Sequence, residues 1–161
     1  MSTARIRIAI VGLLLACFAA MVHAQALPAR FDPQRDAEAD LAYALAIAQR
    51  DGKRVIVDIG GEWCTWCHIM DRFLARDEPS RTLLARHYVL LKVNFSKENP
   101  NAALLARWPK VAGYPHLFVL APDGTLLHSQ DTGALEAGDD YDPRKFRGFL
   151  TRWAAGAAGR A

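Results

Sequence analysis

Hydrophobic positions follow two different periods along the chain, and each period predicts a different kind of element. Apolar residues recur every three or four positions before Gly52, after Cys64 and near the C-terminus, which is typical of amphipathic helices. The run 54–59 is instead short and β-branched, which indicates a strand buried on both faces, as in parallel sheets. A second apolar run at 88–93 predicts another strand.

Toward the C-terminus the order of the expected elements changes from alternating helices and strands to two successive strands followed by a helix. A strand, a tight turn and a strand are expected at 116–120, Pro122–Gly124 and 125–128. Helices are expected from Pro33 to Asp51, from Cys64 past Leu74, from Ser80 to Arg86, from Asn101 to Trp108 and from Pro143 to Trp153. The order predicts an α/β fold in which a βαβ half and a ββα half share one central mixed sheet, with helices on both faces.

The first residues have a different pattern and are expected to lie outside this fold. Arg5 and Arg7 precede an apolar stretch at 8–22, which is too short for a comfortable membrane span and ends in small residues. We expect 1–24 to be a cleaved secretory signal, 25–35 a linker, 36–155 the folded domain and 156–161 a frayed tail. A lipid on Cys17 is the alternative, although the apolar run continues past that residue.

Composition narrows the class of partner. The 161 residues suit a single domain, and the net charge of +3 falls to +1 without Arg5 and Arg7. Since the mature chain has no stripe of Lys and Arg, we expect no nucleic-acid partner. Of the three cysteines, only Cys64 and Cys67 remain after cleavage. A bridge between them closes almost no loop and stabilises little, so the pair indicates chemistry rather than structure.

The stretch 62–68, E-W-C-T-W-C-H, is compatible with c-type haem, with zinc or with a redox dithiol. Haem would use His68 as one axial ligand and would need a methionine or histidine on its opposite face. Met70 lies only two residues from His68 on the same helix and cannot reach that face. Structural zinc needs about four ligands, and no second ligand pair is present. We therefore expect no metal and no cofactor. A purely structural disulfide, or two buried thiols, remains an alternative.

A redox dithiol accounts for the surroundings of the pair. Cys64 stands where a helix begins, and the unpaired N–H groups and dipole at that end stabilise a thiolate. Such a cysteine has a lowered pKa and is the attacking nucleophile. Cys67 lies one turn further, close enough to resolve a mixed disulfide. The pattern predicts a thiol–disulfide oxidoreductase.

Two separated motifs resemble the thioredoxin superfamily. Val57-Asp58 with Glu62-Trp63-Cys64 and Cys67 is similar to its active-site pattern, and 111–115, V-A-G-Y-P, resembles its cis-proline segment. The W-C-x-W-C form and the export signal resemble periplasmic thioredoxin-like and disulfide-isomerase-like members. The resemblance covers about 36–153 and implies a thioredoxin fold. Thr65-Trp66 in place of Gly-Pro, and His68 in place of lysine, leave the direction of electron flow open.

The resemblance also implies roles for single residues. Asp58 would be a buried carboxylate that assists deprotonation of Cys67, with Lys92 as its charge partner. Substrate would dock on Trp63, Trp66, Tyr114 and Pro115, the last with a cis peptide bond. For each of these, plain packing or a solvent-facing position is the alternative.

Two further residues would tune the thiols. His68, when protonated, adds positive charge that lowers the pKa of the cysteines, and Glu62 opposes it. The acidic stretch 131–142 is expected to be a solvated loop, with substrate selection as the alternative.

These expectations describe an exported, periplasmic, monomeric enzyme that reduces or isomerises protein disulfides. Its partners would be proteins with cysteines or disulfides, and a membrane-bound thiol–disulfide electron donor. A non-catalytic thioredoxin-fold binding module or chaperone is the second class of function.

Overall fold

The computed structural model describes residues 26–156. The expected signal cleavage, the lipidation alternative at Cys17 and nearly all of the expected C-terminal tail lie outside these residues. In this part of the chain, no helix is long and apolar enough to cross a membrane.

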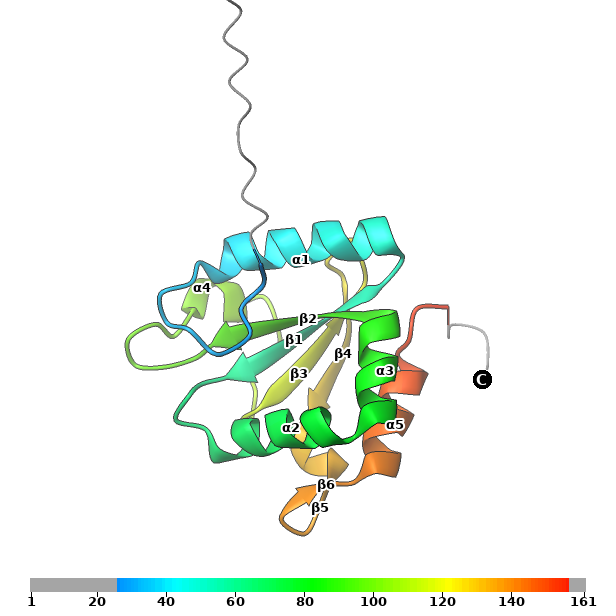
Figure 1. Ribbon diagram of the computed structural model, residues 1–161. Coiled ribbons are helices and arrows are strands. Elements are labelled where there is room, and N and C mark those ends of the chain that lie inside the picture. Colours follow the sequence, from blue (N-terminus) through cyan, green and yellow to red (C-terminus); the bar gives the residue numbers. More distant parts are fainter. Residues whose placement is uncertain (1–25, 157–161) are drawn as a thin grey trace, which may run out of the picture.

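A four-stranded mixed sheet forms the centre of the fold (Figure 1). Its strands are β1 (Arg54–Gly60), β2 (Tyr88–Asn94), β3 (His116–Leu120) and β4 (Leu126–Asp131), in the order β2-β1-β3-β4. β1 is parallel to β2 and antiparallel to β3, and β4 is antiparallel to β3. The expected α/β thioredoxin fold, with a βαβ half and a ββα half, is confirmed.

Helices cover both faces of the sheet (Figure 1). They are α1 (Ala37–Asp51), α2 (Thr65–Arg76), α3 (Glu78–His87), α4 (Ala102–Leu105) and α5 (Pro143–Arg152). Val55, Val57 and Ile59 of β1 pack in a core with α1, whereas Ile56 packs in a second core with α2, α3 and α5. Because side chains alternate along a strand, Asp58 points to the same face as Ile56, the face that α2 covers.

The expected helix boundaries need three corrections. α1 begins at Ala37 rather than Pro33, because the Asp36 carboxylate caps it by accepting from the N–H groups of Glu38 and Ala39. α3 begins at Glu78 with Asp77 as its cap, and Ser80 is a buried residue inside the helix. The helix expected at 101–108 is a single turn, and Asn101 before it has a φ of 45°.

The acidic stretch 131–142 is folded, not a solvated loop. It forms the 3₁₀ helix η1 (Thr132–Leu135) and a hairpin of β5 (Glu136–Ala137) and β6 (Asp140–Tyr141). Thr132, Leu135 and Tyr141 are buried, so the stretch has its own apolar contacts with the domain. The acidic residues between these three positions made the stretch look solvent-exposed in the sequence.

Candidate active site

A disulfide joins Cys64 and Cys67 at the start of α2, and their Cα atoms lie 5.2 Å apart. Cys64 is the N-cap residue of this helix, and the backbone N–H of Cys67 donates to the Cys64 sulfur over 3.1 Å. The Cys64 side of the bridge is 4% exposed and Cys67 is fully buried. Cys64 is therefore the more exposed cysteine of the two, and it lies where the helix presents N–H groups.

Two glycines before the pair are required by close packing. A Cβ atom on Gly60 would lie 2.4 Å from the Cys67 sulfur, and one on Gly61 would lie 2.3 Å from Nε1 of Trp63. Neither contact is possible without a shift of the neighbouring side chain. The end of β1 can therefore lie directly beneath the disulfide only because Gly60 lacks a side chain, and Gly61 leaves room for the Trp63 ring.

Asp58 and Lys92 form a buried ion pair on adjacent strands, where their Cα atoms are partners in the β1–β2 register. Lys92 Nζ lies 3.0 Å from Asp58 Oδ2 and 2.8 Å from Asp71 Oδ1 on α2. Asp58 is 1% exposed, and its Oδ1 has no hydrogen-bond partner among the described residues.

The two members of this pair have shifted pKa values with different causes. Burial raises the pKa of the Asp58 carboxyl, and the positive charge of Lys92 opposes this only in part. Burial alone would lower the pKa of Lys92, but Asp58 and Asp71 together outweigh it and raise that pKa. Lys92 thus stays charged, while the pKa of the Asp58 carboxyl is moved upward, in the direction of neutral pH.

Aromatic side chains gather near the disulfide: Trp63 directly precedes Cys64 in the chain, and Tyr114 packs against the cluster that contains both cysteines. Trp63 is 57% exposed, and its indole N–H donates to the carbonyl of Phe95 over 2.7 Å. The Tyr114 ring lies edge-on to Trp63 and stacks on Phe95, with centroid distances of 5.6 and 4.8 Å. The Tyr114–Pro115 peptide bond is cis.

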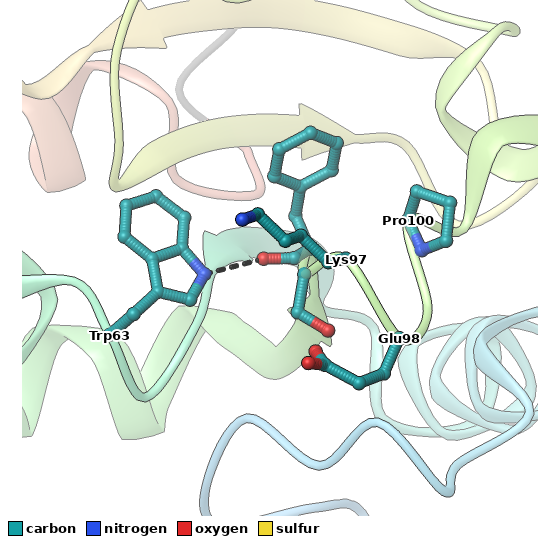
Figure 2. Close-up of a pocket in the computed structure, with 6 residues that line it drawn as sticks. Trp63, Lys97, Glu98 and Pro100 are labelled. Atoms are coloured by element: carbon teal, nitrogen blue, oxygen red, sulfur yellow. Dashed lines mark hydrogen bonds between the residues drawn. The ribbon is translucent and has the colours of Figure 1, made fainter.

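An open pocket of about 640 Å³ lies beside Trp63 (Figure 2). The loop after β2 forms its other wall, with Phe95, Ser96, Lys97, Glu98 and Pro100. Tyr114 of the cis-proline segment contacts Trp63 of this pocket and also packs against the cluster that contains both cysteines.

Trp66 lies between the cysteines but is half-buried. Its ring is edge-on to Tyr141 of β6 at 5.6 Å. The hydroxyl of Thr132 in η1 donates to the carbonyl of Pro115 over 2.6 Å. The folded acidic stretch thus contacts both the first turn of α2, at the residue between the cysteines, and the cis-proline segment.

His68 and Glu62 make contacts that the sequence did not predict. Nε2 of His68 lies 2.8 Å from the backbone carbonyl of Glu62, so this nitrogen carries a proton and donates. The Glu62 carboxylate accepts from the N–H of Phe31 over 3.1 Å. Both residues therefore hold the loop before Cys64 to its neighbours.

Sequence reasoning missed Phe31, Asp71 and Tyr141 at this site. Asp71 could have been found, because it lies four residues after Cys67 and therefore on the same side of the helix. Phe31 belongs to the expected linker 25–35, yet it is 3% exposed and packs against both cysteines. Within residues 26–156, no three His, Cys, Asp or Glu side chains gather as metal ligands.

The model of a family described as thioredoxin-like matches residues 36–122. The chain belongs to the thioredoxin-like family. Among curated relatives, the thiol:disulfide interchange protein DsbD of Pseudomonas fluorescens is 29% identical over 116 residues, which are 71% of this chain. The related DsbD 2 of Pseudomonas aeruginosa is 28% identical over 118 residues. The match spans only 18% of the length of each relative.

Solved structures resemble this thioredoxin-like chain as well. A disulphide isomerase from Xylella fastidiosa superposes with a TM-score of 0.66 and 26% identity, over 80% of this chain and 98% of its own. The C-terminal domain of DsbD from Neisseria meningitidis, in its oxidised form, has a TM-score of 0.53 and 19% identity over 75% of this chain and 97% of its own, which shows the shared fold. Family membership and the paired cysteines support a thiol–disulfide oxidoreductase.

Proposed function

We propose that this thioredoxin-like protein is exported to the periplasm, where it reduces or isomerises disulfides of other proteins. The observation that carries the proposal is the position of Cys64, at the N-cap of α2 with the N–H of Cys67 directed at its sulfur. These groups stabilise negative charge on that sulfur, as an attacking thiolate requires.

The reaction begins from the reduced form. The Cys64 thiolate attacks one sulfur of a substrate disulfide, forms a mixed disulfide and releases the other substrate sulfur as a thiolate, which takes a proton. The Cys67 thiol then loses its proton and attacks the Cys64 sulfur. This step releases the second substrate thiolate and restores the Cys64–Cys67 disulfide. Two electrons have passed from the protein to the substrate.

Asp58 takes the proton of Cys67 in the second step. A carboxyl whose pKa is raised by burial can accept a proton near neutral pH and return it later. Lys92 holds this carboxylate at 3.0 Å and compensates its charge while it is ionised. The raised pKa and the ion pair support this assignment.

Substrate docks on the aromatic side of the site. Trp63 offers exposed apolar surface, and the segment at Tyr114 and Pro115 offers backbone groups beside it. Trp66 contributes the part of its ring that Tyr141 leaves uncovered. His68 supplies positive charge near the thiolate when protonated, and Glu62 opposes it.

Export and the electron supply complete the proposal. The charged, apolar and small-residue segments of 1–24 support a signal peptide. The protein is a monomer with no cofactor, and a membrane-bound thiol–disulfide donor returns the pair to the reduced form. The curated relatives are named as thiol:disulfide interchange proteins, which supports a partner of this kind.

Insulin reduction with dithiothreitol as electron source tests the activity. Wild type accelerates it, Cys64→Ser abolishes turnover, and Cys67→Ser retains attack but accumulates mixed disulfides that gel electrophoresis without reductant resolves. If the wild type gives no acceleration and Cys67→Ser traps no protein, the chain is a binding module or chaperone rather than an enzyme.

A further inference from the structure

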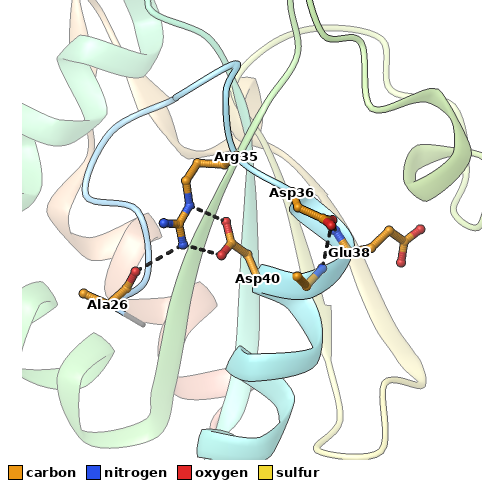
Figure 3. A network of polar contacts seen from close by, with 6 residues as sticks. Ala26, Arg35, Asp36, Glu38 and Asp40 are labelled. Atoms are coloured by element: carbon orange, nitrogen blue, oxygen red, sulfur yellow. Dashed lines mark hydrogen bonds and ion pairs between the residues drawn. The ribbon is translucent and has the colours of Figure 1, made fainter. Parts of the chain in front are cut away.

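Residues 26–36, here called the N-terminal strap, are folded onto the domain ahead of α1. The guanidinium of Arg35 donates to the carbonyl of Ala26 over 3.2 Å and to the carboxylate of Asp40 on α1, and thereby closes the strap into a loop (Figure 3). Asn99, in the loop after β2, donates through its amide to the carbonyl of Pro33 over 2.9 Å. In Figure 1 this segment passes beside the carboxyl ends of β1 and β2.

Phe31 lies in the middle of the strap and is directed into the active site. Its backbone N–H donates to the Glu62 carboxylate, and its side chain is 3% exposed in a cluster with Cys64 and Cys67. A Cβ atom on Gly60 would lie 2.4 Å from the Cys67 sulfur and 3.0 Å from Cζ of Phe31. The ring and the buried sulfur therefore flank the same point above β1.

The same ring also faces the buried ion pair. Lys92 Nζ lies 4.2 Å from the centroid of the Phe31 ring while it contacts Asp58 and Asp71. An ammonium group over an aromatic face is attracted to it, most strongly where water is excluded. Lys92 is 6% exposed, so this site is nearly dry.

We propose that Phe31 is a positioning residue, which seals the Cys67 sulfur from external reagents and holds the Lys92 ammonium against Asp58. The Cys67 thiol can then react with the adjacent mixed disulfide at Cys64, whereas thiols and disulfides of other molecules cannot reach it. The effect on turnover rests on the proposed function, whereas the sealing is a property of the folded protein.

Alkylation of the reduced protein by iodoacetamide, followed by mass spectrometry of the two cysteines, measures the seal. For Phe31→Ala we expect labelling of Cys67 relative to Cys64 to rise by about tenfold, equivalent to about 1.4 kcal/mol less protection. Phe31→Leu fills much of the same space and should stay within about twofold of wild type. Arg30→Ala, an exposed change in the same strap, is the matched control and should leave the ratio unchanged.

Acylation of lysines by acetic anhydride measures the second role. Lys92 should react faster in both Phe31→Ala and Phe31→Leu, because both lack the aromatic face, while the exposed Lys110 reacts at the wild-type rate. General destabilisation would instead lower amide-exchange protection throughout β1 and β3, which we expect to be unchanged. If Phe31→Ala does not fold, the acylation of Lys92 in Phe31→Leu decides.

The proposal is overturned if Cys67 labelling and Lys92 acylation both remain at wild-type levels in folded Phe31→Ala, or if Lys92 acylation does so in folded Phe31→Leu. Insulin reduction by the same proteins separates this from the proposed activity. A wild type that does not reduce insulin refutes the activity and leaves the labelling result intact. An active wild type whose folded Phe31→Ala variant shows unchanged Cys67 labelling and unchanged Lys92 acylation refutes only the role of Phe31.

Discussion

Asp58 is a carboxyl group placed where water cannot reach it, and its chemistry follows from that position. It is 1% exposed, it has one charged partner on the neighbouring strand, and burial raises its pKa. A general base can accelerate the attack by Cys67 only at a pH below the pKa of that thiol, where the thiol would otherwise keep its proton. The contribution of Asp58 should therefore depend on pH in a defined direction.

For Asp58→Asn we expect the release of substrate from the mixed disulfide to slow by about tenfold or more near pH 7, within the range of general base catalysis. The loss should shrink as pH rises above the pKa of the Cys67 thiol, because the thiolate then forms without help. Stopped-flow measurement of the second step across pH 6–10 checks this. Asp71→Asn, which removes the other carboxylate on Lys92, is the control and should slow the step less. If the ratio of the wild-type rate to the Asp58→Asn rate were the same at every pH, Asp58 would have a structural role only.

At the scale of elements, the hairpin β5–β6 is fastened to the active-site helix α2. Tyr141 lies edge-on to Trp66 and 5.8 Å from Phe73, centroid to centroid, and it also contacts Phe146 of α5. An ion pair between Arg76 and Asp140 adds a polar connection at the surface. Tyr141 therefore links the residue between the cysteines to the second core.

Tyr141→Ala should lower the free energy of unfolding by about 3 kcal/mol or more, as truncation of a buried aromatic residue does. It should also change the fluorescence of Trp66, because that ring loses its edge contact. Tyr141→Phe keeps the ring and is the matched control. Urea unfolding and tryptophan emission provide both measurements, and equal behaviour of the two variants would show that the ring is not the link.

The stability of the whole molecule should fall with acid in part through His116. This residue begins β3, is 6% exposed, and its Nε2 lies 2.8 Å from Oγ of Ser129 on β4. Burial lowers its pKa, the charge of His128 adds to that shift, and Asp131 opposes it. At low pH the unfolded chain therefore binds a proton that the folded chain resists.

The contribution of His116 is present above its unfolded pKa, about 6.5, and is lost as pH falls toward the lowered folded value. Each unit of the shift corresponds to about 1.36 kcal/mol. Unfolding of wild type and His116→Gln should therefore differ in slope between pH 7.5 and 5, with the variant losing less stability. Parallel curves would mean that His116 titrates alike in both states.

The sequence by itself determined the class of fold and the chemistry of the cysteine pair. Both depend on local rules: side-chain period separates helices from strands, and a spacing of three residues at a helix start places two sulfurs within reach. The pairing of Asp58 with Lys92 was implied by the resemblance to the thioredoxin superfamily, and the parallel register of β1 and β2 places the two residues side by side.

Only the tertiary structure decided what surrounds that pair. Phe31 reaches Cys67 across 36 positions of sequence from a stretch without periodicity, and Tyr141 reaches Trp66 from a stretch whose acidic residues indicated solvent. Such contacts depend on how whole elements pack together. The hydrophobic effect favours burial of apolar surface but has no direction, so the sequence does not show which distant residue will cover it. The helix starts differ from the expected ones for a local reason: the carboxylates of Asp36 and Asp77 cap α1 and α3, so these helices do not begin at Pro33 and Ser80.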